Sequence, residues 1–75
     1  GGGMADLLLV GGTGVLGGRI AERFAQRDVP FRALVRPATD ASPLRGLGAE
    51  VARGDLTVPG TLPPALTGIR TVVTT

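Results

Sequence analysis

The sequence predicts an α/β fold built on one parallel sheet. Short apolar or β-branched runs alternate with segments of helical periodicity, in the order strand, helix, strand, helix, strand, helix, strand. Glycines and prolines fall at the junctions, where they end one element before the next begins. Regular alternation of this kind is typical of parallel sheets with right-handed crossovers. We therefore expect strand order 3-2-1-4, with helices flanking the sheet, in a truncated half of a doubly wound domain.

Four segments predict the strands of this sheet. The first contains a continuous apolar run, Leu7–Val10, which is typical of a strand buried on both faces. The second follows Pro30, and the third is ended by Gly54 and Asp55. The four predicted strands are Asp6–Val10, Phe31–Val35, Glu50–Arg53 and Thr71–Thr74.

The longest helical segment is Val15–Gln26. Leu16, Ile20 and Phe24 recur every four residues and predict an apolar face that packs into the core. The arginines at positions 19, 23 and 27 share the opposite face, which we interpret as solvated and not as a nucleic-acid surface.

Two short helices complete the prediction. Ser42 is a candidate N-cap before Pro43, and that helix is expected to reach Leu47, with Gly48 as its stop. A second short helix is expected over Thr61–Leu66, ended by a glycine.

Composition excludes several classes of chemistry. The 75 residues carry a net charge of +2 and contain no cysteine, histidine or tyrosine, and every basic residue is arginine. These absences exclude a disulfide scaffold, a thiol nucleophile, a Tyr-Lys proton relay and a P-loop lysine within this chain, and we expect no metal site. With two phenylalanines and no tryptophan, the chain offers no stacking platform for single-stranded nucleic acid.

The two ends of the sequence carry further expectations. Gly1–Gly3 precede Met4 and are interpreted as a cloning remnant, which leaves residues 4–75 as one domain unit. The longest apolar run has four residues, so we expect no membrane span or secretory signal and a cytoplasmic protein. The last predicted strand is uncharged and has no further strand beside it, so we expect either self-association through its edge or a marginal stability that a bound ligand raises. We also expect partly bare apolar faces on Leu7–Val10 and Val72–Val73.

A glycine motif carries the functional prediction. Gly11, Gly14 and Gly17 form G-x-x-G-x-x-G between the first strand and the first helix. Gly11 permits a tight exit from the strand, Gly14 leaves room for a pyrophosphate to approach the backbone, and Gly17 lets the helix pack closely. The unpaired amides and positive dipole of a helix N-terminus favour the same anion. The alternative, a tight turn without a ligand, requires fewer glycines.

Two charged residues follow later strands. Sites selective for NAD place an acidic residue at the end of the second strand, but residues 29–39 contain none and carry Arg32 and Arg36 instead. Arg36 can bind a ribose 2′-phosphate through two parallel hydrogen bonds from its guanidinium. The alternative interpretation of Arg36 is a solvated arginine at the end of a strand. Asp55, which follows the third strand, is as readily explained on physical grounds as a turn or helix-cap residue as it is as a ligand contact.

The residues of these motifs together resemble a known family. Gly11–Gly17, Leu34–Arg36 and Gly54–Leu56 are similar to the N-terminal half of an atypical short-chain dehydrogenase/reductase with a Rossmann-type fold, in the NmrA-like NAD(P)-binding group. The resemblance implies that Thr13–Leu16 wrap the pyrophosphate, that Asp55 and Leu56 border the adenine, and that Thr74 and Thr75 begin the wall near the distal ribose. The cofactor-binding residues so expected are Gly11, Thr13, Gly14, Val15, Leu16, Gly17, Arg36, Asp55 and Leu56.

These expectations leave three readings of the chain open. In the first, the chain is the NADP(H)-binding half of an NADPH-dependent reductase and is not catalytic alone, with NAD as a possible second cofactor. In the second, it is a non-catalytic NAD(P)-sensing module. In the third, it is a minimal Rossmann fold fragment. In the family it resembles, catalytic residues lie further along the chain, so no catalytic residue is assigned here.

Overall fold

The computed structural model describes residues 5–75, and the interpretation of Gly1–Gly3 as a cloning remnant lies outside the described residues. The predicted order of strands and helices is confirmed, with one additional 3-10 turn. The strands are β1 (Leu7–Val10), β2 (Arg32–Val35), β3 (Glu50–Arg53) and β4 (Thr71–Thr74). The helices are α1 (Val15–Gln26), α2 (Ser42–Gly46) and α3 (Leu62–Leu66), with the 3-10 turn η1 over Pro59–Thr61.

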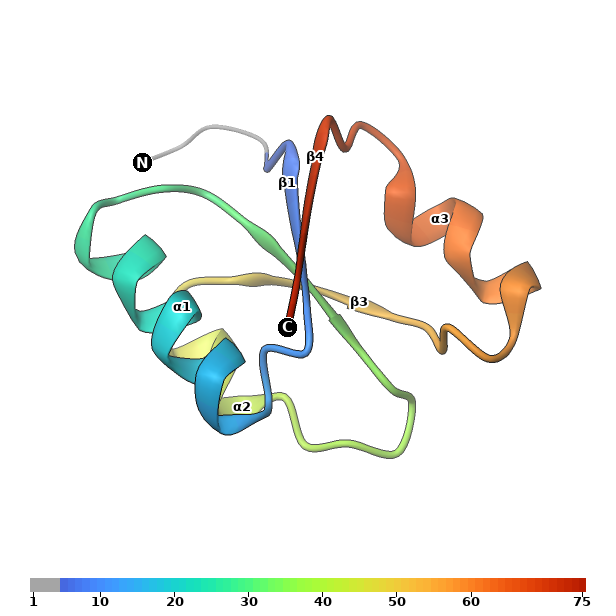
Figure 1. The fold of residues 1–75 in the computed structure, drawn as a ribbon, viewed down its shortest axis with the longest axis horizontal. Helices are drawn as coiled ribbons and strands as arrows, with labels where there is room; N and C mark the ends of the chain where they lie inside the picture. Colours follow the sequence, from blue (N-terminus) through green and yellow to red (C-terminus); the bar gives the residue numbers. More distant parts are fainter. Residues whose placement is uncertain (1–4) are drawn as a thin grey trace.

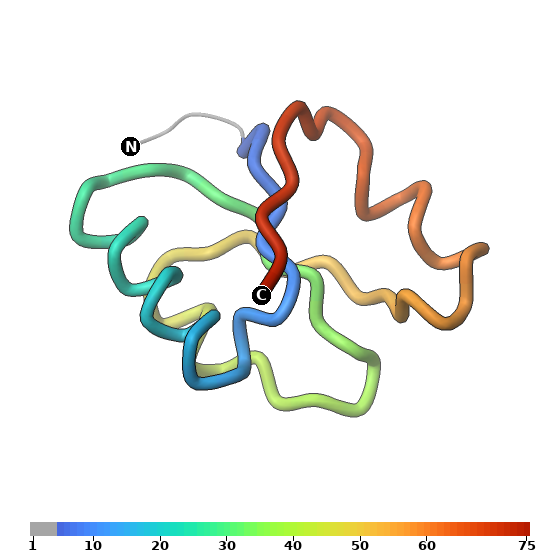
Figure 2. The backbone as a smooth tube through the Cα atoms, in the orientation of Figure 1, coloured from blue at the N-terminus to red at the C-terminus, as the bar shows by residue number. Residues whose placement is uncertain are grey.

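The four strands form one parallel sheet in the order β3-β2-β1-β4, as predicted (Figure 1). β1 lies in the centre, pairing Leu8 with Arg32 of β2 on one side and with Val72 of β4 on the other. Figure 2 follows the chain from β1 through α1 to β2 and later back to β4 beside β1. The sheet is the expected truncated Rossmann-type sheet.

The helices cover the two faces of this sheet unequally. α1 and α2 lie on one face and α3 on the other (Figure 1). The larger core, on the α1 and α2 face, contains Leu9, Phe31, Val35 and Leu44, all nearly inaccessible to solvent. The smaller core, on the α3 face, contains Leu8, Leu34 and Ala65. Alternate residues of β1 therefore enter different cores, as the pleat of a strand requires.

The predicted apolar face of α1 is wrong at its first position. Leu16 is 62% exposed, and the buried residues of α1 are Gly17 and Ala21. A Cβ built on Gly17 would collide with the carbonyl oxygen of Gly11, so only glycine lets the helix lie this close to the strand. That close approach turns the small residues inward and leaves Leu16 on the outside.

The ends of α2 also differ from the prediction. Ser42 is the first residue of α2 and not its N-cap, and α2 ends at Gly46 instead of Leu47. The Asp40 carboxylate accepts hydrogen bonds from the Ser42 amide at 3.0 Å and from its hydroxyl at 2.6 Å. Asp40 therefore orders the entrance to α2, because its side chain reaches the backbone two residues ahead.

The expected bare apolar face is wrong for β1 and correct for part of β4. Leu8 and Leu9 are buried, since helices cover both faces of the central strand. Val72 is 51% exposed, on the edge strand β4. Within residues 5–75, no helix is long and apolar enough to cross a membrane.

Candidate functional site

A pocket of about 300 Å³ opens at the carboxyl ends of the strands. Ligands of open α/β sheets bind in this position, where the loops after the strands diverge. The lining residues come from the ends of β1 and β2 and from the loop after β3. They are Val10, Gly11, Thr13, Leu34, Val35, Arg36, Thr39, Gly54 and Leu56.

The loop after β1 needs glycine at its first position. Gly11 has φ +88°, a left-handed conformation that side chains rarely adopt. Its carbonyl accepts a hydrogen bond from the Gly14 amide at 3.1 Å, which closes the turn into α1. A Cβ on Gly11 would also collide with the Thr75 hydroxyl. The predicted role of Gly11 in a tight strand exit is confirmed.

The N-terminus of α1 is suited to an anion. Its N-cap is Gly14, with no side-chain hydrogen bond to the cap and no acidic residue in the first turn. Val15 and Leu16 beside it are 83% and 62% exposed. A Cβ on Gly14 would meet only the Gly11 carbonyl, at an ordinary 3.5 Å, so the space outside Gly14 is open to an approaching group. The first-turn amides and helix dipole would stabilise a pyrophosphate there.

Gly17 has a packing role in this structure. It is buried beneath the loop, against the backbone of Gly11 and Gly12. Gly12, which the motif analysis did not single out, lies in the same layer: an added Cβ would come within 3.2 Å of Leu9 and 3.3 Å of Leu44. The glycines of the motif thus divide between an open edge at Gly14 and a core-facing layer at Gly12 and Gly17.

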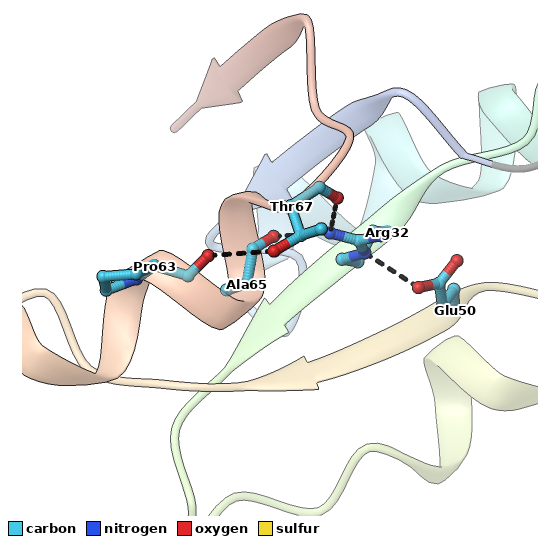
Figure 3. Close-up of polar contacts among 5 residues, drawn as sticks. All are labelled: Arg32, Glu50, Pro63, Ala65 and Thr67. Atoms are coloured by element: carbon cyan, nitrogen blue, oxygen red, sulfur yellow. Dashed lines mark hydrogen bonds and ion pairs between the residues drawn. The ribbon is translucent and has the colours of Figure 1, made fainter.

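The two arginines of the second strand have different environments. Arg36 is exposed at the pocket, whose lining contains no carboxylate. Arg32 is buried, and its guanidinium is held by Glu50 and by the carbonyls of Ala65 and Thr67 (Figure 3). Of the two candidates for a phosphate contact, only Arg36 is available.

Asp55 is placed beside the pocket and does not line it. Its carboxylate accepts hydrogen bonds from the Thr57 hydroxyl at 2.7 Å and from the Thr57 amide at 2.9 Å. These two bonds hold the pKa of the Asp55 carboxyl below its ordinary value, and the bond from the hydroxyl has the larger effect. The charge of Arg36 lowers this pKa further. The turn interpretation of Asp55 is therefore the one that its contacts support, while its neighbour Leu56 does line the pocket.

Several lining residues were not predicted from the sequence. They are Val10, Leu34, Val35, Thr39 and Gly54. The signal that could have found them is position, because each lies in the last two residues of a strand or in the loop after one. Gly54 is constrained as well: an added Cβ would lie 2.9 Å from Leu34 and 3.2 Å from the Thr61 carbonyl oxygen.

With this geometry in place, comparison with known proteins gives the class. Residues 11–75 match the family model described as NAD(P)H-binding, and the chain belongs to that family. It is a nicotinamide-dinucleotide-binding domain, as the resemblance implied.

Two curated relatives show how varied the family is. The chain is 44% identical over 63 residues to an NAD(P)H azoreductase of Xenophilus azovorans, covering 84% of this chain. It is 42% identical over 70 residues to the photosystem II assembly factor Ycf39 of Trieres chinensis, covering 93% of this chain. The matched region is 22% of the length of each relative.

Solved structures agree on the fold. The chain superposes on the crystal structure of gox2253 with a TM-score of 0.83 at 40% identity, over 92% of this chain and 21% of that one. It superposes on the Citrobacter sp. triphenylmethane reductase complexed with NADP(H) with a TM-score of 0.74 at 33% identity, over 89% of this chain and 24% of that one.

Proposed function

We propose that this domain binds NADP(H), with the adenosine part in the pocket and the pyrophosphate at the N-terminus of α1. The observation that carries the proposal is Arg36, exposed at the end of β2 beside a pocket without a carboxylate in its lining. An NAD-selective site needs an acceptor for the ribose 2′-hydroxyl at this position, whereas an arginine suits a 2′-phosphate.

The other residues take roles that follow from their positions. Val15 and Leu16 offer first-turn amides to the pyrophosphate, and Thr13 and Gly14 border it from the turn before α1. Leu56 offers an exposed apolar side chain to the adenine. Thr75 lies against Gly11, on the β4 side of the loop, where it would begin the wall near the second ribose. When bound, the dinucleotide supplies hydride chemistry, and these residues hold and orient it.

The test is a calorimetric titration of the 75-residue chain with NADP⁺, NAD⁺ and ADP. We expect NADP⁺ to bind more tightly than NAD⁺, and Arg36→Asp to abolish or reverse that preference. Loss of the charge-assisted contact should cost about 1.5–3 kcal/mol of NADP⁺ binding. Equal affinities for the two dinucleotides in the unmodified chain would contradict the proposal. Absence of binding altogether would favour the minimal fold fragment.

We further propose that the domain, over residues 4–75, is the cofactor-binding part of an NADPH-dependent reductase and does not catalyse by itself. The similarity to an azoreductase and to a triphenylmethane reductase supports this reading. The sequence contains no histidine, cysteine, tyrosine or lysine, so apart from carboxylates it offers no side chain suited to proton transfer near neutrality. Steady NADPH oxidation by this chain with a carbonyl or quinone substrate would overturn the proposal.

A second candidate is a non-catalytic NAD(P)-sensing module. The similarity to a photosystem II assembly factor, a name that describes no reaction, favours it. The two candidates separate when the chain is joined to the rest of a full-length relative. If the chain is part of a reductase, the joined protein oxidises NADPH in a substrate-dependent way, whereas if it is part of a sensor, the joined protein binds the cofactor without turnover.

A further inference from the structure

The guanidinium of Arg53 holds the turn that carries Arg36. Arg53 is the last residue of β3 and is exposed. Its Nη1 donates to the Arg36 carbonyl at 3.0 Å and to the Thr39 carbonyl at 2.5 Å. A residue of one strand therefore reaches across to the loop that follows the neighbouring strand.

The same turn is closed from within by a backbone hydrogen bond. The Thr39 amide donates to the Arg36 carbonyl at 3.0 Å, so that oxygen accepts from both Thr39 and Arg53. Arg36 and Thr39 both line the pocket, at the two ends of this four-residue turn. Arg53 thus fixes both ends of the segment through one nitrogen.

Arg36 depends on this support for its direction. Within the described residues, its side chain makes no hydrogen bond or ion pair, and its interaction with the nearby charge of Asp55 is electrostatic only. The backbone that carries Arg36 therefore contributes to where the guanidinium points. A long, exposed arginine side chain has high rotamer entropy, and a loose backbone beneath it would add further disorder. A bidentate contact with phosphate requires that both the side chain and the backbone beneath it are restricted in conformation.

We propose that Arg53 is a positioning residue that orients Arg36 toward a ribose 2′-phosphate and thereby sets the preference for phosphorylated over unphosphorylated dinucleotides. The inference rests on the proposed function, since it presupposes that Arg36 contacts the 2′-phosphate. It adds a residue that neither the glycine motif nor the pocket lining contains.

The first measurement requires no cofactor. Arg53→Met keeps the apolar stem and removes every donor, while Arg70→Met, on an exposed arginine just before β4, serves as the matched control for lost charge. We expect hydrogen exchange of the Thr39 amide to accelerate about tenfold or more in Arg53→Met and to stay unchanged in Arg70→Met. Unchanged exchange in Arg53→Met overturns the clamp.

The second measurement is affinity for NADP⁺ and NAD⁺ in the same variants. We expect Arg53→Met to weaken NADP⁺ binding by about tenfold and NAD⁺ binding by less than about twofold. Arg53→Lys, which retains a donor, should recover part of the loss. Because Arg53 acts through Arg36, adding Arg53→Met to Arg36→Gln should cost little more, since coupled residues are not additive.

The outcomes separate the two proposals. If the unmodified chain prefers NADP⁺ and Arg53→Met leaves that preference intact, the inference about Arg53 is wrong and the proposed function stands. An equal loss of both cofactors also overturns it, because a merely structural residue would act in that way. If the unmodified chain shows no preference for NADP⁺ over NAD⁺, both the proposed function and the inference are wrong. This holds even if hydrogen exchange of the Thr39 amide accelerates in Arg53→Met as expected.

Discussion

Arg32 of β2 and Glu50 of β3 are register partners on neighbouring strands and form an ion pair, with Nε 2.8 Å from Oε1 (Figure 3). The same guanidinium donates through Nη1 to the carbonyls of Ala65 at 2.7 Å and Thr67 at 2.8 Å. It therefore satisfies two carbonyls at the C-terminal end of α3, where backbone acceptors lack helical partners. One buried side chain ties α3 to the sheet.

The first prediction is that Arg32 matters more to stability than its partner. Arg32→Met should lower the free energy of unfolding by about 3 kcal/mol, because the buried Ala65 carbonyl loses its donor. Glu50→Gln should cost less than about 1 kcal/mol, because the Glu50 side chain is 53% exposed and water replaces its contact. Urea unfolding of both variants measures the difference. Equal losses would show that the ion pair, and not the capping of α3, is the dominant contribution.

The second prediction separates two glycines of one motif. Gly14→Val should abolish cofactor binding with little loss of stability, because Gly14 has φ −79° and open space on its outer side. Gly17→Ala should lower the melting temperature, because its Cβ would collide with the Gly11 backbone. Gly46→Ala is the control: nothing lies near its added Cβ, so it should gain about 0.5–1 kcal/mol. Melting curves and NADP⁺ titrations decide the matter, and a Gly14→Val chain that still binds would refute it.

The third prediction concerns acid. Ser42 donates hydrogen bonds to Asp40, and Thr57 donates them to Asp55. These bonds lower the pKa of each carboxyl below its ordinary 3.8, and in both cases the bond from the hydroxyl has a larger effect than the bond from the amide. A depressed folded-state pKa contributes stability above pH 3.8, and that contribution is lost as the pH falls through the folded value. The urea midpoint should therefore drop between about pH 5 and pH 2, and less steeply in the Asp40→Asn/Asp55→Asn double variant. Parallel curves for the two proteins would be evidence against this account.

The fourth prediction concerns the two edges of the sheet. The β3 edge carries Glu50 and Arg53, whereas the β4 edge, Thr71–Thr74, carries no charge and exposes Val72. Charged residues protect an edge strand from pairing with another chain, so we expect concentration-dependent association of the 75-residue chain through β4. Val72→Lys should suppress it, and Val58→Lys, on an equally exposed valine outside the sheet, should not. Sedimentation velocity at rising concentration is the measurement; a strictly monomeric chain would show that β4 is not adhesive.

The sequence alone predicted the fold because its signals are local. The apolar run Leu7–Val10, the helical period of Val15–Gln26 and the intervening glycines define one strand–loop–helix unit without reference to the rest of the chain. The alternation of later elements then restricts the topology, since parallel strands need crossovers of one hand. Local patterns also placed Gly11 and Arg36 directly after strands and Gly14 at the start of α1, where they are found.

What only the tertiary structure decided is which side chains are free. Arg32 and Arg36 are both arginines of the same strand region, and the sequence does not distinguish their roles. The guanidinium of Arg32 is buried and bonded to Glu50 and α3, whereas Arg36 lies free of such contacts at the pocket. Leu16 follows a helical period that predicts burial, yet the close approach of Gly17 to Gly11 turns it outward. The reach of Arg53 to the Arg36 turn joins residues 17 positions apart. Periodicity reports the direction of a side chain relative to its own element, whereas burial and hydrogen bonding depend on how elements approach one another.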